Sequence, residues 1–425
     1  MNSSSQKTHS TTCPECQASI PAIPGYVNWC DRCNWNVQTP EEKESRTWTD
    51  RLNQHFGPLY ERRLFESLVQ NRDLLHKRNG GARILAYLIA GLVHSLTLIF
   101  AALGLFFIVK FWPNIVFLFL GLLSLAIAWV TFPRTMKRPN NRLDRQEYKT
   151  LYEITDRIAK ELGLKRIDGI IPSHQFNASF FKVGWRGENY FEVGLPLFSI
   201  LTPGEQVALL GHEVAHGVNK DAQRSFFIGS ALQSLFRWYQ MLMPESLFSS
   251  ESGIEGILMV PVNLVLLILA KLVESIAYLL GLLLYQDSQR AEYLADLLST
   301  RAAGSEHMVS MLEKPYFSEV SQLAAQRVSI DKGKNVIEEL RQLVSDMPPR
   351  EIERLRRVAR LEGGRIDTTH PPTPLRIEFI NYGYSSPAIT ITPDEAERLE
   401  QELETLLPTV QSQLVDEYRE GLYNL

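Results

Sequence analysis

The sequence contains few cysteines, no excess of positive charge and no unusual share of glycine or proline. Its 425 residues include 4 cysteines, 25 glycines and 22 prolines, and the formal net charge at pH 7 is -4. These counts exclude disulfide-rich secreted, collagen-like and low-complexity proteins. A protein that binds nucleic acid is expected to carry a strongly basic domain, so the near-neutral charge predicts no nucleic-acid partner.

Charged residues are also absent from two long apolar runs in the first third of the chain. No Asp, Glu, Lys or Arg occurs from 84 to 109 or from 111 to 133, and only Lys110 separates the two runs. About 20 helical residues cross the hydrocarbon core of a bilayer. Residues 83–133 are therefore expected to form a transmembrane helical hairpin that contacts the lipid bilayer; the alternative is a buried helical pair in a soluble core.

Basic residues flank this hairpin at both outer ends. They are Arg72, Lys77, Arg78 and Arg83 before it, and Arg134, Lys137, Arg138, Arg142 and Arg145 after it. Basic segments next to membrane helices stay in the cytoplasm, so both ends of the hairpin are expected to face the cytosol. The sequence thus predicts a multi-pass protein of the inner or plasma membrane, with the parts before and after the hairpin in the cytoplasm.

All the cysteines lie near the amino terminus, in the pairs Cys13, Cys16 and Cys30, Cys33. Two CxxC pairs with a short spacer can direct four thiolates at one ion, a pattern typical of a structural zinc site. Disulfides or a redox dithiol are the alternatives, and a reducing cytosol disfavours disulfides. We therefore expect 1–39 to form a zinc ribbon with a disordered N-terminus and an unknown partner, and 40–82 to form a charged helical linker.

A metal-binding motif, HExxH, occurs at residues 212–216. On a helix, His212 and His216 lie about one turn apart on the same face, so both imidazoles can bind one zinc ion. Glu213 lies next to that face. It is predicted to be the catalytic base that accepts a proton from water activated by the zinc ion.

The residues around this motif predict its local structure. A polar helix is expected over 142–162, followed by a β-hairpin built from 176–181 and 190–193. Residues 202–205 have the sequence TPGE, in which the threonine can cap a helix and the glutamate can complete a capping box. The motif therefore lies on a helix, which Gly217 is expected to end.

A second helical stretch supplies candidates for a third metal ligand. Glu292 and Asp296 are four residues apart and share one helix face. Glu292 is predicted to bind the catalytic zinc ion. Asp296 is predicted to accept a hydrogen bond from the far nitrogen of a ligand histidine, which fixes the tautomer of that histidine. Without the HExxH motif, this pair would be read as an ordinary solvated helix face.

From about 143 to 384, the sequence resembles the HtpX-like and CaaX-prenyl-endopeptidase group of membrane zinc metallopeptidases, which are gluzincins. The matching segments are NA at 177–178, VGL at 193–195, HEVAH at 212–216, RAEYLAD at 290–296, THPP at 369–372 and RI at 376–377. The resemblance implies that His212, His216 and Glu292 bind zinc and that Glu213 is the base.

The same resemblance implies further roles. The edge strand that binds the substrate backbone in this group corresponds to Asn177, Ala178, Ser179 and Phe180. His370 is expected to approach the metal, and Arg376 is expected to pair with an acidic group; with Asp296, both are assigned to the surroundings of the metal ligands. The amino-terminal zinc ribbon does not belong to the core pattern of the group.

The remaining segments complete the predicted fold. Within residues 218–287, the stretch 225–243 is apolar but contains Arg237, and 256–285 is strongly apolar but contains Lys271 and Glu274. We expect a membrane-embedded or membrane-skimming helical hairpin insert here, with a soluble helical cap as the alternative. Residues 387–425 are expected to form a C-terminal helix. The predicted fold class is a mainly α membrane protein with a zinc ribbon and a transmembrane hairpin. Residues 134–386 are predicted to form an α+β gluzincin metallopeptidase domain, in which a small β-sheet lies beside the active-site helix.

These features predict a membrane-anchored zinc metalloendopeptidase that hydrolyses peptide bonds at the cytosolic membrane face, with one catalytic and one structural Zn2+. Its expected partners are polypeptide substrates, membrane proteins in particular, and the resemblance implies membrane-protein quality control. Two alternatives stay open: processing of one defined substrate, and a non-catalytic membrane scaffold whose ribbon binds another protein. A scaffold has no need of a base such as Glu213, which weighs against the second alternative.

Overall fold

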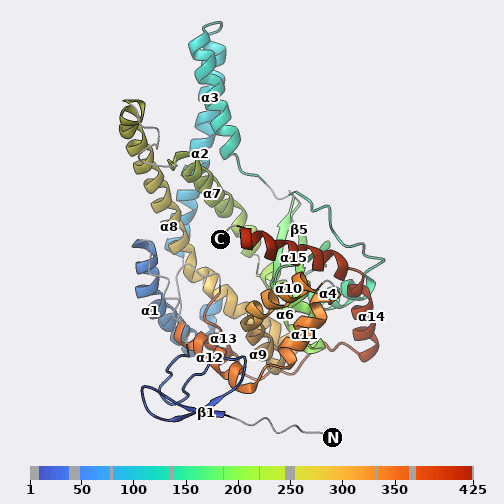
Figure 1. The fold of residues 1–425 in the computed structure, drawn as a ribbon. Coiled ribbons are helices and arrows are strands. Elements are labelled where there is room, and N and C mark those ends of the chain that lie inside the picture. The colour runs from blue at the N-terminus through green and yellow to red at the C-terminus, as the bar shows by residue number, and fades with distance from the viewer. Residues whose placement is uncertain are drawn as a thin grey trace.

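The computed structural model describes residues 9–37, 48–76, 80–134, 137–184, 186–219, 221–244, 254–331, 333–362 and 370–423. Figure 1 shows a mainly helical body that contains a small β-sheet, and apolar helices that extend away from that body. The predicted combination of a mostly helical chain, a small sheet and apolar helices is therefore confirmed.

The apolar hairpin consists of α2 (Gly80–Lys110) and α3 (Ile115–Thr131). The two helices approach closely at Gly104 and Gly121, since a Cβ atom on Gly104 would lie 2.8 Å from the carbonyl oxygen of Gly121. By length and composition, α2 and α8 (Ile254–Ala303) are apolar enough to cross a membrane, and α3 is a shorter apolar helix.

The segment between the two metal-binding motifs forms α7 (Asp221–Leu242) and then the single helix α8. We expected a helical hairpin over 218–287, and α7 packs against the apolar part of α8. The second metal-binding motif does not form a helix of its own, because α8 continues for 50 residues through the apolar stretch and into Glu292. No proline lies between the two parts to interrupt the helix. Lys271 pairs with Glu274 at 2.8 Å, as their spacing allows.

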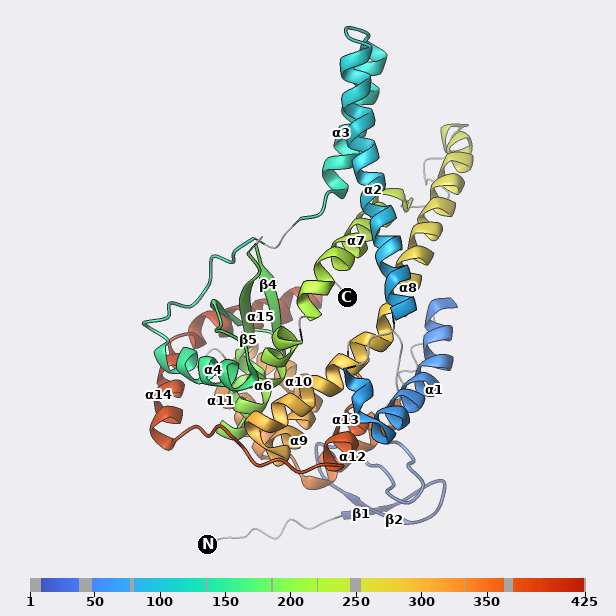
Figure 2. The same cartoon turned by 180° about the vertical axis from the view of Figure 1, so that it is seen from behind.

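Helices α2, α7 and α8 pack side by side through small and aliphatic side chains (Figure 2). The buried members of this cluster are Ala86, Ala90, Val93, Ile228, Ala231, Leu235, Val273 and Leu280. The Nε2 atom of His94 on α2 lies 2.9 Å from the carbonyl oxygen of Phe227 on α7. The apolar hairpin is thus joined to the helices that lead into the metal centre.

Part of the predicted linker belongs to the helical body. Helix α1 (Trp48–Gln70) packs Phe65 against Tyr293 of α8 and against Phe379. The short 3-10 helix η1 (Arg72–Leu75) follows it. Because α1 buries apolar side chains on the body, this part of 40–82 is packed structure and not a free spacer.

The small sheet contains β3 (Gly169–Ser173), β4 (Ala178–Val183) and β5 (Glu188–Gly194), in the order β3-β5-β4. β4 and β5 pair antiparallel, which confirms the predicted β-hairpin. β3 pairs parallel with β5 and was not predicted. The preceding helix α4 (Lys149–Leu162) begins later than expected, and it packs with the sheet in the main core.

The rest of the chain is helical. Its elements are α5 (Leu195–Ser199), α6 (Pro203–Val218), α9 (Ser305–Glu313), η2 (Lys314–Phe317), α10 (Ser318–Ile330), α11 (Val336–Ser345), α12 (Pro349–Glu362), α13 (Thr373–Asn381), α14 (Pro393–Glu404) and α15 (Leu407–Tyr423). The expected single C-terminal helix is therefore two helices. Pro408, the second residue of α15, has no backbone N–H to donate to the carbonyl oxygen of Glu404, so the helical hydrogen bonds of α14 cannot continue unbroken into α15.

Candidate metal centre

Helix α6 carries the HExxH motif and begins as predicted. The Glu205 carboxylate accepts a hydrogen bond from the backbone N–H of Thr202 at 2.8 Å, and the two residues form a capping box. Gly217 does not end the helix, which continues to Val218. A Cβ atom on Gly217 would lie 2.5 Å from the Phe180 ring. This glycine therefore allows strand β4 to pack closely against the metal-binding helix.

Helices α6 and α8 cross at short range, which brings the two motifs together. The Ser299 hydroxyl on α8 donates a hydrogen bond to the carbonyl oxygen of Ala208 on α6 at 2.7 Å. A Cβ atom on Gly211 would lie 3.1 Å from the Ser299 hydroxyl oxygen. A small residue at position 211, next to His212, thus allows the two helices to approach closely.

The three predicted metal ligands meet at this crossing. The Nε2 atoms of His212 and His216 lie 3.3 Å apart. Oxygens of Glu292 lie 3.5 Å from Nε2 of His212 and 3.4 Å from Nε2 of His216. A tetrahedral zinc ion with bonds of about 2.0–2.1 Å has ligand atoms about 3.3–3.5 Å apart. The three side chains therefore fit three corners of a zinc site.

Two buried charged groups orient His212 from behind. Nδ1 of His212 lies 3.0 Å from Oδ1 of Asp296. The Arg376 guanidinium donates two hydrogen bonds to the Asp296 carboxylate, at 2.6 and 2.8 Å. Arg376 thus pairs with an acidic group, as expected, and Asp296 holds the histidine with Nε2 directed at the other two ligands.

These contacts change the protonation of the metal ligands. Burial acts to lower the pKa of His212, but its hydrogen bonds to Asp296 and Glu292 outweigh burial and raise the pKa to about 10. Burial acts to raise the pKa of Glu292, and its contacts with His212 and His370 outweigh that effect and lower the pKa well below its usual value. The site thus keeps a carboxylate ready for a cation.

His370 also reaches this cluster. Its Nδ1 atom lies 2.5 Å from an oxygen of Glu292. Ligand atoms of His212, Glu292 and His370 all lie within 4.8 Å of one another. The expected approach of His370 to the metal position is therefore seen in the geometry. Of the THPP motif at 369–372, only the threonine at 369 lies outside the described residues.

Glu213 lies next to the metal-ligand face of α6 and is 8% exposed. Among the described residues, its carboxylate forms no ion pair. A carboxylate with no competing cation can accept a proton from water or from a substrate, which is what a general base requires.

Residues 145–383, more than half of the chain, match the sequence profile of Peptidase family M48. The chain belongs to this family. Protease HtpX of Pseudomonas putida (strain GB-1) is similar, with 27% identity over 170 residues, which cover 39% of this chain and 55% of that protein. Protease HtpX homolog of Pyrobaculum calidifontis is 27% identical over 243 residues, which cover 54% of this chain and 67% of that protein. The match thus covers only about half of the first of these relatives. No solved structure matches the chain significantly.

In this M48 chain, the predicted substrate-binding residues lie on the edge strand nearest to the metal-binding helix. Ala178, Ser179 and Phe180 belong to β4, and Asn177 precedes it. One side of β4 pairs with β5, and in the described part of the chain no strand pairs with its other side. An extended peptide can add to such an edge through backbone hydrogen bonds.

The four cysteines also come together. They follow and flank the antiparallel strands β1 (His9–Thr12) and β2 (Ser19–Ala22). The Sγ atoms of Cys13 and Cys33 lie 3.6 Å apart, and those of Cys16 and Cys30 lie 3.5 Å apart. These distances exceed a disulfide bond of about 2.05 Å and are close to the roughly 3.8 Å between sulfurs around one zinc ion. The backbone N–H of Cys33 lowers the pKa of Cys30 to about 7, whereas burial and the neighbouring sulfur atoms raise the pKa of Cys33 to about 12.

The cysteine ribbon docks on α12 of the same chain, a contact that the sequence analysis missed. Three arginines of α12 donate hydrogen bonds to ribbon carbonyl oxygens: Arg350 to Trp29 at 2.5 Å, Arg354 to Val37 at 2.9 Å and Arg357 to Asp31 at 2.7 Å. The Arg350 and Arg357 guanidiniums also lie over the Trp29 ring, 4.3 and 4.8 Å from its centre. The spacing of these arginines, on one helix face, was the available signal.

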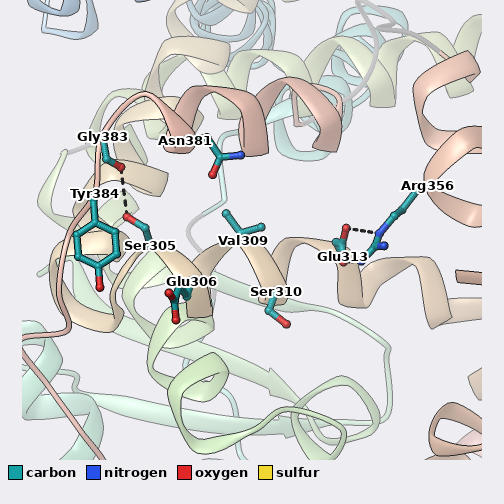
Figure 3. Close-up of a pocket in the computed structure, with 9 residues that line it drawn as sticks. All are labelled: Ser305, Glu306, Val309, Ser310, Glu313, Arg356, Asn381, Gly383 and Tyr384. Carbon is teal, nitrogen blue, oxygen red and sulfur yellow. Dashed lines mark hydrogen bonds and ion pairs between the residues drawn. The ribbon is translucent and has the colours of Figure 1, made fainter. Parts of the chain in front are cut away.

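The opposite side of α12 borders a pocket of about 480 Å³ (Figure 3). Its lining residues are Ser305, Glu306, Val309, Ser310, Glu313, Arg356, Asn381, Gly383 and Tyr384. Arg356 of α12 pairs with Glu313 of α9 at 2.7 Å. None of the predicted site residues lines this pocket. The ion pair between Arg356 and Glu313 joins α12, on which the ribbon docks, to α9 of the metallopeptidase body.

Proposed function

We propose that this chain is a membrane-anchored zinc metalloendopeptidase that hydrolyses peptide bonds of protein substrates at the cytosolic face of the membrane. The observation that carries the proposal is the arrangement of His212, His216 and Glu292, whose ligand atoms lie at the spacing of a tetrahedral zinc site beside Glu213. Membership of peptidase family M48 and similarity to proteins named Protease HtpX support it.

Each residue has a role in this proposal. When bound, the zinc ion supplies Lewis acidity for attack on a peptide carbonyl. Glu213 accepts the proton of the attacking water and donates it to the leaving amide nitrogen. Asp296 and Arg376 keep the His212 imidazole in one tautomer and orientation. Strand β4 aligns the substrate backbone.

The four-cysteine cluster is proposed to hold a second, structural zinc ion. Four thiolates occupy every position of a tetrahedral zinc ion, which is typical of structural sites. His212, His216 and Glu292 occupy three positions and leave the fourth open for water or substrate, which is typical of catalytic sites. Hydrogen bonds from α12 then fix the position of the ribbon relative to the rest of the chain. On this proposal the chain binds one catalytic and one structural zinc ion.

The exposed apolar surface of α2 and α3 supports the membrane anchor. Trp129 is 75% exposed and Leu92 is 72% exposed, values that are costly for large apolar side chains in water. Basic residues after the hairpin support a cytosolic position for the metal centre. Membrane proteins are the proposed substrates, and quality control of membrane proteins is the proposed role. The alternative role for the same peptidase activity is the processing of one defined substrate.

A comparison of Glu213→Gln with the unaltered chain tests the proposal. Purified full-length protein in detergent is expected to hydrolyse casein and a model membrane protein, and a chelator is expected to abolish this hydrolysis. Glu213→Gln is expected to lower hydrolysis by at least about a hundredfold while metal content is unchanged, because the base is lost and the ligands are kept. Glu404→Gln, an exposed residue of α14, is the control. Absence of hydrolysis by the unaltered chain would leave the membrane scaffold as the better description, whereas hydrolysis by Glu213→Gln at the unaltered rate would show that Glu213 is not the base.

A further inference from the structure

Two charged side chains interrupt the apolar part of α8. Lys271 and Glu274 are the only Asp, Glu, Lys or Arg residues from 256 to 286. Their side chains pair at 2.8 Å and are 50% and 31% exposed. Large exposed apolar side chains lie on both sides of the pair, between 259 and 269 before it and between 272 and 282 after it. The pair therefore lies within an exposed apolar surface and not at its edge.

Lys271 belongs to the face of α8 that points away from the other apolar helices. Val273 is buried in the cluster that α8 forms with α2 and α7. At about 100° of turn per residue, position 271 lies on the side of the helix opposite to position 273, and it shares that side with 264, 268 and 282. Leu264, Ile268 and Leu282 are 50%, 60% and 37% exposed. We call this side, with its Lys–Glu pair, the outer face of α8; in Figures 1 and 2 the amino-terminal part of the helix stands apart from α3.

The pair has hydrogen-bonding capacity that its own contact does not use. The Lys271 ammonium has three N–H donors, and the Glu274 carboxylate can accept about four hydrogen bonds. Within the described residues, the ammonium donates to one oxygen of Glu274, and neither group forms another ion pair. Ionisable groups that face lipid are costly, and those in membrane segments usually contact protein or water. The outer face thus presents a donor and an acceptor for which lipid tails offer no partner.

The pair and the metal centre are parts of one helix. Glu292 follows Lys271 by 21 residues, a separation of about 31 Å along α8. Helix α1 meets α8 between them, where the Tyr278 hydroxyl donates a hydrogen bond to Asn53 at 2.9 Å. An extended peptide covers about 3.3 Å per residue. A helix bound beside Lys271 can therefore present to the metal centre only residues that lie about nine or more positions from its contact with Lys271.

The chemistry of the outer face fits a membrane helix that has a polar residue of its own. An entirely apolar helix would cover the leucines and leave the pair without further partners. A carboxylate or amide in another helix can accept a hydrogen bond from Lys271, and an ammonium, guanidinium or amide can donate one to Glu274. In assembled membrane proteins such residues contact their own helix bundle, so they are exposed chiefly in chains that lack their normal contacts.

A second copy of this chain fits the outer face less well. Copies in one membrane insert in the same direction, and a two-fold axis brings the same surface of each copy to the contact. Each charge of the pair would then face the same charge of the other copy, which is repulsive. Charge complementarity therefore favours a different helix as the occupant.

We propose that the outer face of α8, around Lys271 and Glu274, binds a transmembrane helix of the substrate that carries a polar or charged residue within its apolar span. This inference rests on the membrane-anchored peptidase proposed above and names the class of membrane protein that it cleaves. Leu264 and Ile268 contact apolar side chains of the bound helix, and the pair contacts its polar residue. Because the face lies far from the metal ligands, its occupation lowers KM for such substrates and leaves the chemistry to the metal centre.

The test compares three single-span substrates in phosphatidylcholine vesicles that contain the full-length protein. The substrates share one tail and one leucine-rich span, whose central residue is Leu, Asp or Lys. Each rate is divided by the rate of casein hydrolysis in the same preparation, which corrects for folding and zinc content. The unaltered chain is expected to cleave the Asp and Lys substrates about tenfold or more faster than the Leu substrate, through a lower KM, because each forms charge-assisted hydrogen bonds with the pair.

Variants of the pair give a result that a purely structural role would not produce. The double variant Lys271→Leu with Glu274→Leu is expected to cleave all three substrates at the same relative rate. Glu274→Leu alone should keep the preference for Asp and lose the preference for Lys, and Lys271→Leu alone should show the reverse. The control is Lys149→Gln with Glu153→Gln, an exposed ion pair of α4, which should retain both preferences.

Several results would overturn the docking site. Equal cleavage of the three substrates by the unaltered chain would do so, as would undiminished preferences in the double variant. A dimer of the unaltered chain that dissociates in the double variant, measured by native mass spectrometry in detergent, would assign the outer face to a contact between copies instead. If the double variant fails to fold by circular dichroism, the exchange of preference between the two single variants decides the question.

Two parallel measurements separate this inference from the proposed function. Absence of casein hydrolysis by the unaltered chain would contradict the metallopeptidase, and its loss from vesicles in an alkaline wash would contradict the membrane anchor. Equal cleavage of the three substrates, with casein hydrolysis and anchoring intact, would contradict only the docking of a polar membrane helix at Lys271 and Glu274.

Discussion

Asp296 shows how single residues make the metal centre possible. Its carboxylate is fully buried, a position that is costly for a charge unless it is paired. Arg376 supplies that pairing with two hydrogen bonds, and Nδ1 of His212 lies 3.0 Å from the other side of the carboxylate. A chain of three side chains thus fixes the ring of one metal ligand. His370 contacts a second ligand, Glu292, at 2.5 Å.

Removal of single ligands should separate the two proposed metal sites. The unaltered chain is expected to hold about two zinc ions, and Glu292→Ala or the pair Cys30→Ser with Cys33→Ser should each lower this by about one. Hydrolysis should be lost only in Glu292→Ala, in a preparation that still folds. Zinc content by elemental analysis checks the prediction. Full zinc occupancy in Glu292→Ala would mean that the third ligand is another residue.

The protonation of His212 predicts how zinc affinity depends on pH. With a pKa of about 10, His212 is protonated in the metal-free protein at neutral pH, so zinc must displace a proton. Affinity should therefore rise with pH, by about tenfold per pH unit for one proton released, until the pH reaches the pKa. Zinc competition titrations at pH 7, 8 and 9 measure this slope. A flat dependence would show that no proton leaves when zinc binds.

At the scale of elements, helix α8 connects the apolar part of the chain to the metal centre. One continuous helix contains both the paired Lys271 and Glu274 and the ligand Glu292. A helix transmits position along its axis because its backbone hydrogen bonds are continuous. The apolar segment and the third ligand are therefore parts of one helix.

The edge strand depends on a glycine at the end of β5. A Cβ atom on Gly194 would lie 2.0 and 2.2 Å from the carbonyl oxygens of Gln175 and Asn177, which are backbone atoms and cannot move aside easily. Gly194→Ala should lower the free energy of unfolding by about 1–3 kcal/mol or more and displace the start of β4. Gly421→Ala, where the added Cβ meets nothing within 4 Å, is the control. Denaturant unfolding in detergent compares the two, and equal stability would show that the 175–177 turn can relax.

At the scale of the whole molecule, the cysteine ribbon is joined to the metallopeptidase body through α12. The ribbon accepts hydrogen bonds from three arginines on one face of this helix, and Arg356 on the other face pairs with Glu313 of α9. Helix α12 therefore contacts both the amino-terminal ribbon and helix α9 of the metallopeptidase body. The arginine contacts contribute through charge-assisted hydrogen bonds and through their position over Trp29.

Loss of these arginines should weaken the docking of the ribbon on α12 without removing its zinc ion. The double variant Arg350→Ala with Arg357→Ala is expected to speed amide hydrogen exchange in residues 9–37 by about tenfold or more, because docking contacts are lost. The cysteines are unchanged, so zinc content should stay the same. Arg360→Ala, on the same helix and paired with Glu353, is the control. Unchanged exchange in the double variant would show that other contacts hold the ribbon.

Local features of this protein are determined by its sequence. The capping box at Thr202, the same-face spacing of His212 and His216, and the β-hairpin before α6 follow from interactions between residues close in the chain. Such interactions have the same geometry wherever the segment lies, which is why these three predicted features match the structure.

Other features were decided only by the tertiary structure. The meeting of Glu292 with His212 requires a crossing of α6 and α8 that a glycine and a serine permit, and the docking of the ribbon on α12 joins residues more than three hundred positions apart. The length of α8 and the packing of α1 also escaped prediction. Each depends on which distant surfaces come into contact, and that contact is a property of the folded chain that no local pattern contains.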